Sequence, residues 1–124
     1  MNAAVVAHAA TEPREQLTPY IEIAPIAALC YDLDSARAWV SETLGALAID
    51  DDRHADLRET ARVYFAAGGN YTAAAERLHL HRNTAQYRVR RAEEMRGRPF
   101  SEERLDVELA LLACHWLGRA VLPR

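Results

Sequence analysis

The segment from Asn70 to Met95, NYTAAAERLHLHRNTAQYRVRRAEEM, constrains the fold of this chain more than any other part of the sequence. A short helix rich in small residues, a tight turn and an arginine-rich second helix follow one another in it with no spare residues. This layout is typical of a helix-turn-helix, in which two helices cross steeply. We expect the second helix to cover about residues 82–95.

Small and apolar residues recur in this segment at helical spacing and predict its buried faces. Asn70 can cap the first helix, and the paired alanines Ala74 and Ala75 allow two crossing helix backbones to approach closely. The second helix repeats small residues at i, i+4 and i+7, which places them on one face. The expected inward positions are Tyr71, Ala74, Ala75, Leu78, Leu80, Ala85, Val89, Ala92 and Met95.

The rest of the sequence also favours helices, so the predicted fold class is all-α, a helical bundle of about six helices containing the helix-turn-helix. Residues 1–20 are small, polar and interrupted by prolines, and we expect a flexible N-terminal segment there and a helical domain at 21–124. The expected landmarks of the other helices are a start near Pro25, a cap at Asp34 or Ser35, a helix from Arg53 to Ala67, and a cap at Ser101. The last helix is apolar over a wide arc, so we expect it to be buried against other helices or a second chain.

Charge is distributed unevenly along the chain, although the formal net charge is only −3. Residues 1–69 hold 5 arginines and 11 acidic residues, a net of −6, and residues 101–124 hold 3 and 4, a net of −1. Residues 70–100 hold 7 arginines and 3 acidic residues, a net of +4. Binding to a polyanion depends on the field at the contacting face rather than on the sum over the chain. The basic segment therefore favours nucleic acid as a partner.

Composition argues against several other classes of protein. No apolar run approaches the length of a membrane span, and the N-terminus lacks the basic region of a secretory signal. We therefore expect no membrane partner and a cytoplasmic, nucleoid-associated location. All 15 basic residues are arginine and alanine is abundant, which favours a GC-rich bacterial genome. Cys30 and Cys114 lie far apart and are expected to be buried thiols.

Candidate metal and catalytic residues are few. The run Asp50 to Asp52 brings three carboxylates together, but acidic residues just before a helix more often stabilise its positive N-terminal end. His79 and His81 form an H-x-H pair without a cysteine or carboxylate at a matching ligand spacing. No nucleophile–base–acid constellation and no phosphate-cradling glycine loop is visible. The sequence predicts no enzymatic activity, no metal and no cofactor.

The polar residues of the second helix are left facing outward by its buried stripe. In a helix-turn-helix, the start of the second helix enters the DNA major groove. Arginine can bridge O6 and N7 of guanine, and asparagine or glutamine can bridge N6 and N7 of adenine. Candidate base-edge residues are therefore His81, Arg82, Asn83 and Gln86. Candidate phosphate contacts, which position the protein without reading sequence, are Thr72, Thr84, Tyr87, Arg88, Arg90, Arg91 and the helix N-terminus at Asn70.

The stretch from Leu57 to Phe100 resembles the C-terminal DNA-binding domain of PucR/CdaR-type bacterial transcriptional regulators. Its most specific part is LHLHRNTAQYRVRRAEE at residues 78–94, with the HRNT core at 81–84. The sequences DLDSARAWVSETLGAL and ELALLACHWLG are also similar to that domain, so the resemblance covers roughly residues 23–122. The helix-turn-helix itself is Fis-like: it resembles that of the Fis nucleoid protein, where a base-reading residue aligns with Arg82. The other matching positions are Asn70, Thr72 and Thr84.

The resemblance implies a sequence-specific DNA-binding domain of a transcriptional regulator whose partner is double-stranded operator DNA. Regulators of this family commonly control the catabolism of purines, amino acids or sugar acids. The family also implies an upstream sensor domain that responds to a small molecule. This chain has no room for one, so it is either a fragment or a small stand-alone relative.

The apolar helix surface exceeds what one small core needs, so we expect a homodimer. Its surface would lie on the N-terminal helices or the last helix, where Trp39, Leu112 and Trp116 supply apolar area. Such a dimer would read two half-sites about 34–36 Å apart or a multiple of that distance. The alternative function is a helical protein-interaction or oligomerisation module that does not bind DNA. The overall acidity and the apolar last helix favour that alternative.

Overall fold

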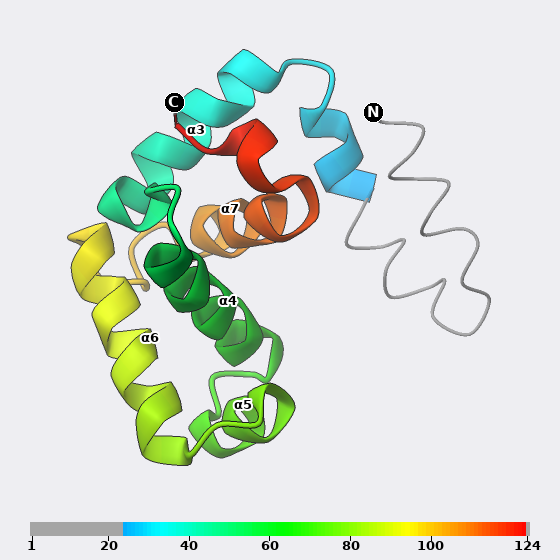
Figure 1. Ribbon diagram of the computed structural model, residues 1–124. Helices are drawn as coiled ribbons and strands as arrows, with labels where there is room; N and C mark the ends of the chain where they lie inside the picture. Colours follow the sequence, from blue (N-terminus) through cyan, green and yellow to red (C-terminus); the bar gives the residue numbers. More distant parts are fainter. Residues whose placement is uncertain (1–23, 124) are drawn as a thin grey trace.

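The computed structural model describes residues 24–123, in which all regular secondary structure is helical (Figure 1). A helical stretch at residues 24–29 comes first. It is followed by α3 (Leu33–Leu44), the 3-10 helix η1 (Gly45–Ala48), α4 (Asp52–Ala66), α5 (Tyr71–Leu78), α6 (Arg82–Arg96), α7 (Arg104–Leu117) and the 3-10 helix η2 (Gly118–Val121). The expected all-α bundle of about six helices is confirmed. The flexible segment expected at residues 1–20 lies outside the described residues.

Helix α4 is the centre of the arrangement, since it contacts α5, α6, α7 and η1. In Figure 1, α6 runs along one side of α4 and α5 lies at the far end of α4. Helices α3, α7 and η2 pack on one another at the opposite end. This arrangement leaves α5 and the start of α6 at one end of the molecule, whereas the end of α6 lies beside η1 and α3.

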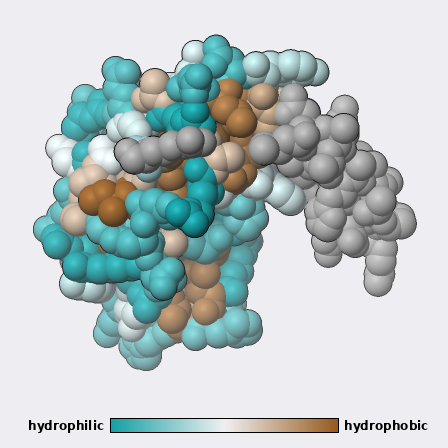
Figure 2. Space-filling model, turned by 45° about the horizontal axis from the view of Figure 1, so that its top comes forward, coloured by the Kyte–Doolittle hydropathy of each residue, from teal (hydrophilic) through white to brown (hydrophobic). Residues whose placement is uncertain are grey.

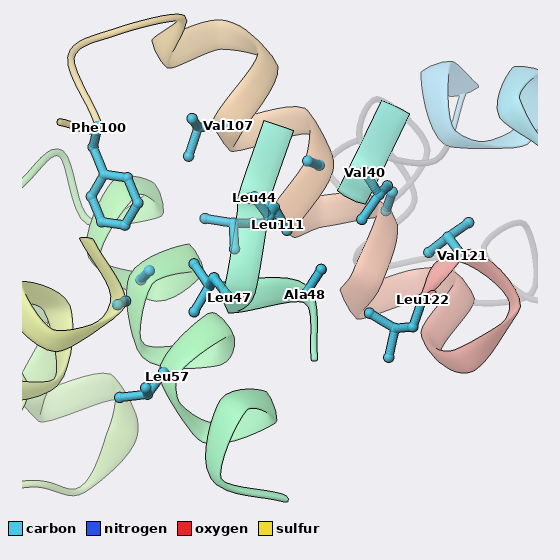
Figure 3. Packing of buried hydrophobic residues seen from close by; sticks show 14 of the residues in the cluster. Val40, Leu44, Leu47, Ala48, Leu57, Phe100, Val107, Leu111, Val121 and Leu122 are labelled. Atoms are coloured by element: carbon cyan, nitrogen blue, oxygen red, sulfur yellow. The ribbon is translucent and has the colours of Figure 1, made fainter. Parts of the chain in front are cut away.

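The core is one cluster of apolar side chains drawn from α3, η1, α4, α6, α7 and the residues that flank them (Figure 3). Leu44 and Leu47 are fully buried, and Leu111 is 2% exposed. Helix α6 contributes the small residues Val89 and Ala92, so its backbone can lie close to the central helix. Apolar residues on the face drawn in Figure 2 form separate patches within a largely hydrophilic surface.

The start of α3 differs from the sequence expectation of a cap at Asp34 or Ser35. Asp32 is the cap: its Oδ1 accepts from the backbone N–H of Ser35 at 3.0 Å, and its Oδ2 accepts from the Ser35 hydroxyl at 2.8 Å. Asp34 and Ser35 lie inside the helix, where Asp34 adds a negative charge to the first turn. The N-cap carboxylate has the better geometry because it points at the free N–H groups of that turn.

The start of α7 also differs from expectation, because the helix begins after Glu103 rather than at Ser101. The backbone N–H of Phe100 donates to Oε2 of Glu93 at 2.8 Å, and that of Glu102 donates to the carbonyl of Pro99 at 3.0 Å. These contacts hold the residues before Arg104 in a turn. The predicted cap at Ser101 is therefore wrong, and the helix starts two residues later.

Helix α7 is less buried than its composition suggests. Val107, Ala110 and Leu111 enter the core, but Leu105 is 71% exposed. Leu112 and Trp116 are half-buried and pack against the edge of the core. Within residues 24–123, no helix has both the length and the apolar character needed to cross a membrane.

The three carboxylates of residues 50–52 have structural roles within the chain. Asp51 caps α4 by accepting from the backbone N–H of His54 at 2.8 Å, and that bond lowers the pKa of Asp51. Asp52 lies in the first turn of α4, and Oδ2 of Asp50 accepts from Nε of Arg119 at 2.8 Å. The interpretation that these carboxylates stabilise the N-terminal end of the helix is confirmed for Asp51 and Asp52 but not for Asp50. No group of three metal-ligating side chains exists among the residues that the structure describes.

The two cysteines are free, as expected, but they are half-buried rather than fully buried. Burial raises the pKa of the Cys114 thiol to about 11. Cys114 is therefore protonated, and so a weak nucleophile, at neutral pH.

Glu59 joins α4 to α7 and should make stability depend on acid pH. Burial alone would raise its pKa, but hydrogen bonds from His115, at 3.0 Å, and from Arg62 outweigh that effect and lower the pKa to about 2. The ionised form is thus favoured by folding, and its contribution is present above the unfolded pKa of about 4.5 and lost as pH falls towards 2. Over this pH range, we expect the free energy of unfolding to fall less in Glu59→Gln than in the parent chain. The difference should be at most about 1 kcal/mol, because the pair is partly solvated.

Urea unfolding at a series of pH values measures this contribution. Glu76→Gln is the matched control, since Glu76 is exposed and has no ion pair within the described part of the chain. If the stability of Glu59→Gln fell in acid as steeply as that of the parent chain, Glu59 would not be the group responsible.

Candidate nucleic-acid interface

The first helix of the helix-turn-helix is fixed at both ends by local hydrogen bonds. Oδ1 of Asn70 accepts from the backbone N–H of Ala73 at 2.9 Å, as expected for its cap. At the other end, His79 adopts the left-handed conformation, with φ 56° and ψ 42°. The backbone N–H of Leu80 then donates to the carbonyl of Ala75 at 2.9 Å. Histidine therefore makes the tight turn at a position where glycine is the commoner solution.

Small side chains bring α5 and α6 together at their crossing. Ala74 and Ala85 are fully buried, and Ala75 is 4% exposed. Further along α6, Val89 and Ala92 continue the buried stripe at 4% and 0% exposure. The inward faces predicted for both helices are confirmed. They fix the rotation of α6 about its axis and so decide which of its side chains reach solvent.

The start of α6 carries an ordered polar group. Nδ1 of His81 accepts from the backbone N–H of Asn83 at 3.1 Å, so His81 caps the helix and presents the other edge of its ring outward. Nη1 of Arg82 donates to Oε1 of Gln86 at 3.3 Å. The same guanidinium lies 5.7 Å from the ring centroid of Tyr71, which is close enough for a cation–π interaction. Arg82 is thus partly oriented before any ligand binds.

Every residue that the sequence nominated for DNA contact reaches the surface. The exposed ones are Asn70, Thr72, His81, Arg82, Asn83, Tyr87 and Arg90, and the half-buried ones are Thr84, Gln86, Arg88 and Arg91. Tyr87 is 64% exposed on the side of α6 opposite the buried stripe. Arg91 lies 3.6 Å from Glu94, an exposed pair of the kind that competes weakly with another anion.

Two arginines of the basic segment have an internal role that the charge count did not reveal. Arg96 is 4% exposed; its Nε donates to the carbonyl of Thr43 at 2.7 Å and its Nη1 to that of Pro99 at 2.6 Å. Nη2 of Arg98 donates to the carbonyl of Glu42 at 2.8 Å. These side chains satisfy carbonyl groups at the C-terminal end of α3. The charge available to a ligand on this face is therefore smaller than the sequence count indicates.

A sequence signal for the burial of Arg96 existed. Arg96 lies four residues after Ala92 and so continues the stripe of Ala85 and Val89 on the inward face. Arginine at such a position needs acceptors from elsewhere in the fold.

Comparison with known proteins also indicates a helix-turn-helix domain. The family model of the PucR C-terminal helix-turn-helix domain matches residues 57–113, which extend from α4 to α7. The chain is 36% identical over 107 residues to an uncharacterized protein in the pkwA 5′ region of Thermomonospora curvata, covering 85% of this chain and 57% of that protein. No solved structure matches the chain significantly.

Two other similar proteins have regulatory names. The chain is 31% identical over 99 residues to the transcriptional activator PmfR of Paenarthrobacter nicotinovorans, covering 80% of this chain and 20% of PmfR. It is 28% identical over 79 residues to the purine catabolism regulatory protein of Bacillus subtilis, covering 64% of this chain and 15% of that protein. The chain thus spans only part of the length of each relative. Together with the two crossed helices α5 and α6, these matches identify residues 57–113 as a helix-turn-helix domain of the PucR C-terminal type.

Proposed function

We propose that this chain is a sequence-specific DNA-binding domain of a bacterial transcriptional regulator and that α6 enters the major groove. The single observation that carries the proposal is the solvent-facing side of α6, which presents Arg82, Asn83 and Gln86 together with the exposed Arg90 and the half-buried Arg91. The first group has the donors and acceptors that read base edges, and the second suits phosphates. The regulatory names of two relatives agree with this function.

The groups at the start of α5 suit the flanking DNA backbone. Oδ1 of Asn70 is occupied by the helix cap, which leaves its amide N–H groups available as donors. Thr72 is exposed in the next turn. We propose that both contact phosphates bordering the groove that α6 enters, as the first helix commonly does in this motif.

We further propose that the domain binds DNA as a homodimer. Leu105 projects from α7 into solvent beside a groove that is also lined by Phe65, Leu109 and Leu112. A second copy of the chain would cover these leucines, and its α6 would reach a second half-site. This groove includes Leu112 of the expected set, whereas Trp39 and Trp116 do not line it.

The experiment that tests the function is selection of genomic fragments by the purified chain, followed by fluorescence anisotropy over a range of salt concentrations. We expect selected fragments to share a motif, with half-sites separated by about 34–36 Å or a multiple. The logarithm of affinity should fall linearly with the logarithm of salt concentration, by about 0.9 per phosphate neutralised.

The exposed Leu105 and the half-buried leucines beside it on α7 also suit the alternative function, a protein-interaction module without DNA binding. The same experiment separates the two functions. A chain that enriches no motif and retains no duplex at low salt would exclude the DNA-binding proposal and favour the alternative.

A further inference from the structure

A polar hollow lies beside α6, at the edge of the helix-turn-helix surface described above. It measures about 320 Å³ and is built where the end of α4, the start of α5, α6 and the start of α7 meet. Its principal polar lining residues are Tyr64, Arg90, Glu93, Ser101 and Arg104. Tyr71 also lines it, and the guanidinium of Arg82 lies over the same tyrosine ring. The hollow is therefore continuous with the start of the surface that we assign to DNA.

Two guanidinium groups give the hollow a positive charge. Arg90 is exposed on α6, and the side chain of Arg104 is 56% exposed at the start of α7. The guanidinium of Arg104 lies 5.3 Å from the ring centroid of Phe65, which supports its position over the hollow. Its Nε donates to Oε2 of Glu108 at 3.1 Å. Because this is a solvated pair, it holds the arginine only weakly, and other donors of the guanidinium can bind another anion.

The remaining polar side chains are one carboxylate and the hydroxyl groups of serine and tyrosine, so the two arginines still outweigh the negative charge of the lining. Oε2 of Glu93, the only carboxylate in the lining, already accepts from the backbone N–H of Phe100 at 2.8 Å. Ser101 supplies a hydroxyl, and Tyr64 supplies a phenol. Burial and a hydrogen bond with Tyr71 raise the pKa of Tyr64, so its phenol adds no negative charge to the hollow at neutral pH. Arginine and hydroxyl donors around a small hollow are the chemistry that binds an oxyanion.

We propose that this hollow binds a backbone phosphate of the same duplex that receives α6, with Arg90 and Arg104 as its charged donors. The inference rests on the proposed DNA-binding function and extends the interface to α7. Arg90 projects from the proposed recognition helix, and Tyr71 links the hollow to Arg82. A phosphodiester next to the occupied groove lies on the same side of the protein, whereas a free phosphate ion gains nothing from this continuity.

The test measures how duplex affinity depends on salt for the parent chain and for Arg104→Ala, with a fluorescein-labelled duplex of mixed sequence as the probe. Loss of one phosphate contact should reduce the slope of log affinity against log salt by about 0.9 and weaken binding to all sequences alike. Arg104→Lys should keep the slope because it keeps the charge. Arg119→Ala is the matched control, since Arg119 is an exposed arginine whose partner is Asp50. It should leave the slope unchanged.

Outcomes against this inference differ from those against the proposed function. If Arg104→Ala keeps the parental slope while Arg91→Ala lowers it, the proposal of a phosphate contact at α7 is wrong, but the proposal of DNA binding is still supported. If the parent chain binds no duplex at low salt, both are wrong.

A second arm distinguishes the source of the phosphate. Inorganic phosphate is titrated into the parent without DNA at constant ionic strength and followed by NMR. We expect no saturable shift of the Arg104 side-chain signal. Saturable binding that Arg104→Ala removes, together with a parental DNA slope, would identify a free-anion site and overturn the assignment to the duplex.

Discussion

Replacing Gly45 with alanine is expected to lower the free energy of unfolding by about 2–6 kcal/mol. Gly45 ends α3 with φ 57° and ψ −137°, a region that is nearly confined to glycine, and forcing another residue into it costs about 1–3 kcal/mol. A Cβ added there would also lie 2.7 Å from the carbonyl oxygen of Arg96. Relieving that overlap requires movement of packed backbone, for which about 1–3 kcal/mol more is typical.

Gly118→Ala separates the two causes. Gly118 has nearly the same backbone conformation, φ 55° and ψ −130°, but an added Cβ would meet nothing within 4 Å. We therefore expect this variant to lose only the conformational part, about 1–3 kcal/mol. Urea unfolding of both variants, with unchanged m-values, measures the difference. Equal losses would show that the approach of Gly45 to Arg96 is unimportant.

The Gly45 contact matters for function because Arg96 is the last residue of α6. Backbone that moves away from an alanine at position 45 would displace the C-terminal end of the proposed recognition helix. We therefore expect the folded fraction of Gly45→Ala to bind DNA less tightly, whereas folded Gly118→Ala should bind like the parent.

The second large effect is expected for Arg82→Ala, which should relax sequence preference by about 1–3 kcal/mol, or roughly 5- to 150-fold. Arg82 is exposed at the start of α6, and its contacts with Gln86 and Tyr71 orient its guanidinium on the surface that we propose contacts DNA. A bidentate contact from this position would distinguish guanine from the other bases. The measurement is the ratio of affinities for a selected operator and for a duplex of mixed sequence, at one salt concentration.

Arg91→Ala is the informative comparison, because it should weaken both duplexes equally. Arg91 lies further along α6 beside Glu94, where it suits a phosphate rather than a base edge. Arg77→Ala, which removes an exposed cation from α5, is the control and should not change the ratio. If Arg82→Ala retained the parental ratio, the register of α6 in the groove would have to be revised.

Much of the helix-turn-helix is predictable because its signals are local. Asn70 caps α5 through an N–H three residues away, and Ala85, Val89 and Ala92 recur with the period of the helix they belong to. The start and rotation of α6 follow from such short-range features. The nominated residues therefore all reach the surface, because exposure on an amphipathic helix is the complement of its buried stripe.

The errors occur where a distant group decides the local structure. Ser101 is a good cap by residue type, but the Glu93 carboxylate binds the N–H of Phe100 and holds the chain in a turn. Leu105 belongs to an apolar helix, yet no helix within residues 24–123 covers it fully. Neither outcome can be read from residue type or spacing, since each depends on how α6 and α7 are placed.

Helical periodicity and capping act over a few residues, so they are sufficient to predict the all-α class, the two helices of the motif and the outward face of α6. Tertiary structure alone decided which arginines are available to a ligand. Arg96 is withdrawn because the carbonyl of Thr43, 53 residues earlier, accepts from it. Arg104 is brought to the hollow beside Arg90 because α7 returns against the end of α4. Both positions depend on contacts between segments far apart in the chain, which local sequence patterns do not reveal.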